Sequence, residues 1–187
     1  MQRGSGTRAA ARRSGVSAVS AMRWLERFSL LLNRALAWAA GLVLVAMMLF
    51  SVLDMALRMI GHDIAGSYEV IGWLSATAMA LALGYTQVHR GHVSINLLVT
   101  HLHGRLRAGI ELAMSLCSLL LFGTLAWYLT GYGGVLRESG SLSETLKAIV
   151  YPWVYVVALG AVGLTLALLV DFLRSAGRFL GYAPDQR

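Results

Sequence analysis

The sequence predicts an all-α integral membrane protein with four transmembrane helices, short amphipathic helices at the membrane surface, and both termini in the cytoplasm. Of its 187 residues, 57% are hydrophobic and 13% are charged, whereas a soluble domain carries about 25% charged residues. Four long stretches contain no charged residue and no histidine. Lysine and arginine are distributed unevenly around these stretches. Together, these observations indicate that lipid is the solvent for most of the chain.

The four uncharged stretches predict the four spans, because a helix needs about 20 mostly apolar residues to cross the hydrocarbon core. The stretches are residues 35–53, 70–88, 112–136 and 148–170. Since helix ends can lie a few residues away from such limits, we expect spans at about 35–56, 69–88, 110–134 and 149–171. We expect them to form one four-helix membrane domain over residues 22–179, followed by a short cytoplasmic tail at 180–187.

The positions of the basic residues predict the orientation of the spans. Positive residues in short flanking segments stay on the cytoplasmic side. Seven arginines precede the first span, and only Arg58 lies in the first loop. The other flanking basic residues are Arg90, Arg105 and Arg107 in the second loop, Arg137 and Lys147 in the third, and Arg174, Arg178 and Arg187 in the tail. The asymmetry places both termini inside and explains the net charge of +7 without a nucleic-acid partner.

The first 21 residues form a basic tail rich in Arg, Ser, Ala and Gly. The tail has no hydrophobic period, so we expect it to be disordered. A cleaved signal peptide is not expected, because the first apolar stretch is too long and too far from the start. The segment beginning at Met22 resembles a natural start, so we hypothesise that translation begins there. Native protein whose intact mass includes residues 1–21 would refute this hypothesis.

Two segments have the periodicity of helices that lie on a membrane surface. The first carries its apolar residues at Trp24, Leu25, Phe28, Leu31 and Leu32. The second carries them at Ile95, Leu98, Val99, Leu102 and Leu106. We therefore expect an interfacial helix before the first span and a second one in the cytoplasmic loop.

The spans show no chemistry for a transport pathway of their own, which needs ionisable groups or unwound backbone near the midplane. The polar residues at depth are hydroxyls, namely Ser75, Thr77, Ser115, Ser118, Thr124 and Thr165. Such groups in lipid mostly bond to their own helix backbone or pack against a neighbour. The acids Asp54, Glu69, Glu111 and Asp171 lie at span edges. No nucleophile motif or phosphate loop indicates an enzyme.

No cofactor or metal site is predicted. Axial haem ligands must face each other inside the membrane, but the histidines lie in loops. They are His62 in the first loop and His89, His92, His101 and His103 in the second. The pair His101 and His103 could bind a metal at the surface, although a polar loop face is favoured because carboxylate and thiol partners are missing. The single cysteine, Cys117, allows no intrachain disulfide.

Three features near the second span have structural explanations. Asp54 and Arg58 are four residues apart, which predicts a local ion pair. Glu69 begins the second span, where the helix dipole favours a negative charge. Small residues recur every fourth position on one face of this span, at Gly72, Ala76, Ala80 and Gly84. That face predicts close helix approach, either as an internal seam or as a contact with a partner.

The second loop reads Gln87-Val-His-Arg-Gly-His-Val-Ser-Ile-Asn-Leu-Leu98. With this loop between four predicted spans, the chain from about Met22 to Phe179 resembles the small membrane subunit, of DctQ type, of tripartite ATP-independent periplasmic (TRAP) transporters. In that family an arginine typically closes the first helix, a glutamate begins the second, a Gly-His-Val segment precedes an amphipathic stretch, and a Pro-aromatic pair starts the fourth. The matching residues are Arg58, Glu69, Gly91, His92, Val93, Leu97, Leu98, Pro152 and Trp153. Asn96 stands where the family often has aspartate, which removes a charge.

The resemblance implies a large multispan permease subunit that carries substrate and sodium, and a periplasmic binding protein that delivers an organic acid. It implies a bacterial inner-membrane location and a scaffold role without a cofactor in this chain. The candidate structural or partner-contact residues are Arg58, Glu69, Gly72, Gly84, His92, Asn96, Pro152 and Trp153. A stand-alone four-helix exporter or channel is the first alternative, and a haem- or quinone-linked membrane enzyme subunit is the second.

Overall fold

The computed structural model describes residues 5–90 and 105–179, with side chains placed over 22–89 and 109–177. Within these residues the chain is helical. The helices are α1 (Ser5–Met59), α2 (Ser67–Arg90), α4 (Arg105–Ser139) and α5 (Tyr151–Phe179). The described residues contain no strand, only an isolated bridge between Leu142 and Ile149. The all-α prediction is therefore confirmed.

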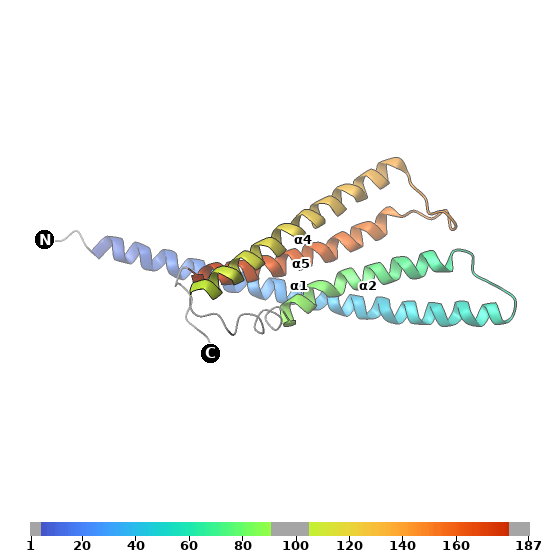
Figure 1. The fold of residues 1–187 in the computed structure, drawn as a ribbon, viewed down its shortest axis with the longest axis horizontal. Coiled ribbons are helices and arrows are strands. Elements are labelled where there is room, and N and C mark those ends of the chain that lie inside the picture. The colour runs from blue at the N-terminus through green and yellow to red at the C-terminus, as the bar shows by residue number, and fades with distance from the viewer. Residues whose placement is uncertain (1–4, 91–104, 180–187) are drawn as a thin grey trace.

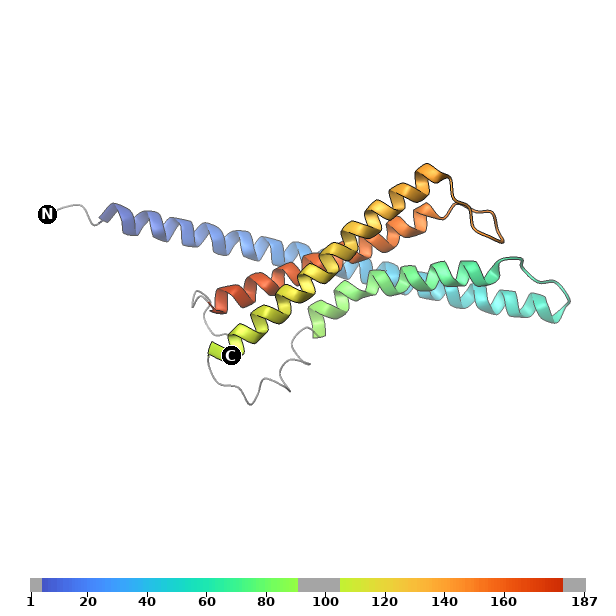
Figure 2. The same ribbon diagram turned by 45° about the horizontal axis from the view of Figure 1, so that its top comes forward.

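The helices form two antiparallel hairpins, α1 with α2 and α4 with α5 (Figure 1). Helix α5 contacts α4, α2 and α1, whereas α4 packs mainly against α5. Figures 1 and 2 show that the hairpins diverge towards their loop ends, and that the loop between α4 and α5 reaches back towards the start of α2. Helix α5 is thus the central helix.

Helix α1 differs in two ways from the sequence-based expectation. It begins at Ser5 and so includes most of the tail that we expected to be disordered; the alanine- and arginine-rich stretch at 9–13 has high helix propensity. The amphipathic segment around Trp24 and Phe28 is not a separate helix, because α1 continues through it without a break. No proline or glycine interrupts residues 22–40. The second amphipathic segment lies mostly in residues 91–104, outside the described residues.

Local backbone signals explain where α1 and α4 end. Gly61 and Gly140 follow these helices with φ angles of 81° and 62°, in the left-handed region that favours glycine at a helix end. The amide of Gly61 donates to the carbonyl of Arg58, closing the last turn. At the start of α5, Pro152 occupies the first turn, where a missing N–H costs nothing.

Three of the described helices are long and apolar enough to cross a membrane, by length and composition. The segments are Met22–Met59, Gly109–Ser139 and Tyr151–Gly177. Helix α2 has 24 residues but is not among them, since glycine, serine, threonine and glutamine lower its mean hydropathy. The count of four spans and the orientation of the termini stay predictions.

The buried core is small and lies where α1, α2 and α5 meet. Leu36, Ala40 and Leu81 form its centre, with Val156 packed against them. In the most apolar window of each candidate span, 44% of residues are buried in α5, against 11% in α1 and 6% in α4. The outer faces of α1 and α4 therefore consist of apolar side chains that a bilayer or a partner would cover.

Candidate partner-contact and helix-anchoring site

Arg58 ties the end of α1 to the start of α2. Its Nε atom lies 2.9 Å from Oδ2 of Asp54, so the predicted ion pair is confirmed. Its Nη2 atom also donates to Oγ of Ser67 at 2.9 Å, and its guanidinium lies 5.1 Å from the ring centroid of Tyr68. Asp54 is buried, and its Oδ1 atom has no hydrogen-bond partner among the described residues. Arg58 is therefore the only described cation paired with this buried carboxylate.

Glu69 ties α2 to the loop between α4 and α5. Its carboxylate accepts hydrogen bonds from Oγ of Ser143, from the amide of Thr145 at 2.8 Å and from the amide of Leu146 at 3.3 Å. Glu69 precedes the apolar stretch 70–88, and these donors satisfy its carboxylate at the start of α2. The helix-dipole explanation was incomplete, because Glu69 also caps a distant loop.

The loop at 140–150 is shaped to receive the Glu69 carboxylate. The amide of Ser143 donates to the carbonyl of Ala148 at 2.9 Å, which closes the loop on itself. Leu146 packs against the turn before α2, where a Cβ on Gly66 would lie 2.5 Å from its Cγ. We call Asp54, Arg58, Ser67, Glu69 and Ser143 the loop-end network. It joins the turns of the two hairpins.

The Pro-aromatic pair at the start of α5 contributes to this end of the bundle. Trp153 stacks on Trp73 of α2, with ring centroids 5.6 Å apart, whereas Pro152 is exposed. The aromatic residue therefore makes an internal contact between the two hairpins. Pro152 favours the start of the helix through its fixed φ angle, and its ring lies on the surface.

The small-residue face of α2 is divided between the two roles that the sequence left open. Ala80 and Gly84 are buried, and a Cβ on Gly160 of α5 would lie 2.5 Å from the carbonyl of Ala80. Gly72 and Ala76 are exposed, and a Cβ on Gly72 would meet no heavy atom within 4 Å. The half of this face nearer the second loop is an internal seam. The other half is open.

Asn33 is a buried polar residue at this seam that the sequence analysis missed. It is 1% exposed, and its Nδ2 atom donates to the carbonyls of Ser29 at 2.9 Å and Gly163 at 3.2 Å. A Cβ on Gly84 would collide with its Oδ1 atom. We call Asn33, Ala80, Gly84, Gly160 and Gly163 the helix crossing. In the sequence, Asn33 can be recognised by the apolar residues that follow it on the same helix face, Leu36 and Ala40.

A second polar network joins the opposite ends of the helices. Nε of Arg174 on α5 lies 2.9 Å from Oε1 of Glu26 on α1. Nε2 of Gln87 on α2 donates to Oδ2 of Asp171 on α5 at 3.2 Å. Polar contacts thus hold α5 to α1 and α2 at this end, while the loop-end network acts at the other.

Two of the candidate partner-contact residues, His92 and Asn96, lie outside the described residues. The hydroxyls of Ser115, Thr124 and Thr165 donate to carbonyls of their own helices, as predicted, whereas Oγ1 of the buried Thr77 has no hydrogen-bond partner among the described residues. Within residues 5–90 and 105–179, no group of three or more His, Cys, Asp or Glu side chains could hold a metal ion. The arrangement anchors helices to one another.

Comparison with known proteins agrees with this arrangement. The family model described as "Tripartite ATP-independent periplasmic transporters, DctQ component" matches residues 47–178. The match covers more than half of the chain and includes the loop-end network, but not Asn33. No curated protein and no solved structure gives a significant match to the chain.

Proposed function

The chain belongs to the DctQ component family of tripartite ATP-independent periplasmic transporters, and from this premise we propose that it is the scaffold subunit beside a large permease subunit. The observation that carries the proposal is the family match over residues 47–178. Family membership makes the chain a small membrane component of a transporter. Its mode of action and its assembly partners are what we propose in addition.

The proposed topology has four spans in the bacterial inner membrane, with both termini in the cytoplasm. Helix α2 is the second span in this arrangement, in addition to the three candidate spans. Its antiparallel packing against α1 supports this assignment, as does its apolar stretch 70–88. The excess of arginine before residue 35 supports the orientation.

The proposed mechanism is mechanical. Asp54 pairs with Arg58 on its own helix, Glu69 holds the loop between α4 and α5, and α5 is tied at both ends to the other hairpin. A rigid bundle of this kind can hold the stationary part of a larger permease in the membrane while the partner's transport domain moves. The partner would bind sodium and the organic acid, and a periplasmic binding protein would deliver the acid. This chain would need no cofactor.

Co-purification tests the assembly. The tagged chain, extracted from its native membrane in mild detergent, is expected to retain a large multispan protein at constant stoichiometry, measured by mass spectrometry. A tagged, unrelated membrane protein of similar size is the control. A chain that purifies alone, or that moves solutes by itself after reconstitution, would instead indicate a stand-alone exporter or channel.

Site-specific labelling tests the topology. In a chain whose Cys117 is replaced by alanine, Glu144→Cys is expected to react with a membrane-impermeant maleimide in spheroplasts, because residue 144 lies in an exposed part of the third loop. Asp185→Cys is expected to react only after the membrane is permeabilised. Equal labelling of both positions in intact spheroplasts would contradict the orientation.

A further inference from the structure

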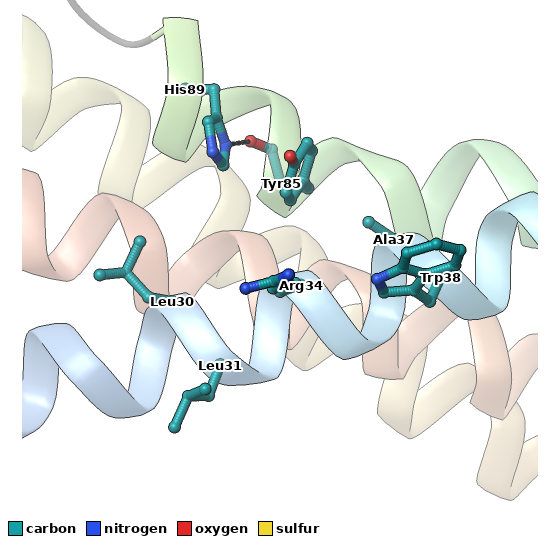
Figure 3. A pocket seen from close by; sticks show the side chains of 7 residues that line it. All are labelled: Leu30, Leu31, Arg34, Ala37, Trp38, Tyr85 and His89. Atoms are coloured by element: carbon teal, nitrogen blue, oxygen red, sulfur yellow. Dashed lines mark hydrogen bonds between the residues drawn. The ribbon is translucent and has the colours of Figure 1, made fainter.

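A groove lies between α1 and α2, at the end of the bundle far from the loop-end network (Figure 3). Its volume is about 560 Å³. The lining residues come from both helices and are Leu30, Leu31, Arg34, Ala37, Trp38, Tyr85 and His89. Leu31 and Trp38 are 67% and 75% exposed. The groove is therefore open on the outer face of the bundle, where lipid would lie.

The polar end of the groove is positively charged. Arg34 is exposed and has no ion-pair or hydrogen-bond partner among the described residues. Nδ1 of His89 lies 3.0 Å from the carbonyl oxygen of Tyr85, so Nε2 is the nitrogen that faces away from this contact, and it donates to an anion only when the ring is doubly protonated (Figure 3). Arg27 lies two turns before Arg34 on the same face of α1 but does not line the groove. Arg34 is therefore the unneutralised cation of the groove.

The acids at this end of the bundle are already engaged elsewhere. Glu26 pairs with Arg174, and Asp171 accepts a hydrogen bond from Gln87. The hydrogen bond from Gln87 leaves the charge of Asp171 in place, but neither carboxylate forms an ion pair with Arg34 among the residues whose side chains are described. Arg34 is therefore open to an external anion.

The groove changes from polar to apolar along α1. Arg34 immediately precedes the uncharged stretch 35–53, so it marks the boundary between headgroups and hydrocarbon. Trp38 lies one turn deeper, and Tyr85 faces the groove from α2 (Figure 3). Tryptophan and tyrosine are enriched at this depth because one end of each ring is apolar and the other polar. An amphiphile with an anionic head fits both ends of the groove.

We propose that this groove binds one anionic phospholipid, with its phosphate on Arg34 and the start of an acyl chain against Trp38. Basic pockets between transmembrane helices bind such headgroups in this way. On the proposed orientation, the lipid belongs to the cytoplasmic leaflet. The inference rests on the transmembrane assignment of α1 in the proposed function, but not on the identity of the large subunit.

Native mass spectrometry of the purified full chain tests the proposal. The chain in detergent would be titrated with phosphatidylglycerol and, separately, with phosphatidylcholine. We expect one phosphatidylglycerol to bind at least fivefold more tightly than phosphatidylcholine. Because one lysine or arginine near an anionic lipid contributes about a fivefold change in affinity, Arg34→Gln is expected to weaken phosphatidylglycerol binding by about that factor.

A variant that fills the groove separates a bound lipid from general attraction to positive charge. Ala37→Phe keeps every charge but occupies the groove, and it is expected to abolish the tight site. Ala39→Phe is the matched control, because Ala39 is exposed on the same helix and does not line the groove. Arg137→Gln removes an exposed arginine at the other end of the bundle. Both controls are expected to bind phosphatidylglycerol as the wild type does.

Several results would overturn the proposal. Equal affinity for the two lipids would do so, as would equal losses in Arg34→Gln and Arg137→Gln. If Ala37→Phe lost the large subunit in co-purification but kept the lipid, the groove would belong to that partner instead. Circular dichroism of every variant separates a lost site from a lost fold. A failed co-purification of the wild type would refute the scaffold proposal without changing lipid binding by the isolated chain.

Discussion

Replacing Gly160 by alanine is expected to destabilise the helix bundle by about 1–3 kcal/mol, the usual cost of overpacking. The new Cβ would lie 2.5 Å from the carbonyl carbon and oxygen of Ala80 and 2.9 Å from the amide nitrogen of Leu81. These are backbone atoms, so no side-chain rotation can relieve the collision. Helices α2 and α5 would have to separate. Thermal unfolding of the purified chain in detergent measures the loss.

Gly72→Ala is the matched control for this effect. It makes the same substitution on the small-residue face of α2, but its Cβ would meet nothing within 4 Å. Because alanine has a higher helix propensity than glycine, we expect unchanged or slightly higher stability. If both variants melted at the same temperature, the close approach of α2 and α5 at the helix crossing would be wrong.

Replacing Glu69 by alanine is expected to release the loop between α4 and α5 from α2. The variant removes the acceptor for the Ser143 hydroxyl and for the amides of Thr145 and Leu146. We expect hydrogen exchange at these two amides to accelerate by roughly tenfold or more, because both lose a charge-assisted hydrogen bond. Exchange within α5 should change much less. The measurement is exchange mass spectrometry on the full chain.

Glu144→Ala provides the control for Glu69→Ala, because Glu144 is exposed on the same loop and is no part of the loop-end network. It removes the same charge and should leave the amide exchange unchanged. Glu69→Gln keeps an accepting oxygen and should give an intermediate rate. Equal acceleration by the Glu69 and Glu144 variants would mean that the loop responds to net charge alone.

Hydropathy alone was sufficient to place most helices, because a chain in lipid must satisfy its backbone polar groups within helices. The uncharged stretches 35–53, 112–136 and 148–170 fall inside candidate spans, apart from a few residues before α5. The signal is weaker for α2, because glycine, serine, threonine and glutamine lower its mean hydropathy. Close packing against α1 and α5 requires small residues at Ala80 and Gly84, and the glycine among them contributes to this effect.

The contacts between helices were less predictable than the helices. Glu69 and Ser143 are 74 residues apart, and no local periodicity encodes their meeting. Asn33 was not predicted for another reason. Only the uncharged stretches were considered as membrane-buried, and the first of these begins after Arg34, which leaves Asn33 outside it. The spacing of Asp54 and Arg58 did predict their ion pair, because both lie one turn apart on one helix.

The shallow burial of α4 affects how long the chain survives in the cell. Helix α4 packs mainly on α5, and only 6% of its most apolar window is buried. Detachment of α4 should therefore be the least costly opening of the bundle. A partner that covers its bare side would suppress this opening by mass action. In cells that lack the partner, we expect membrane proteases to remove the orphan chain, so that its abundance follows that of the partner.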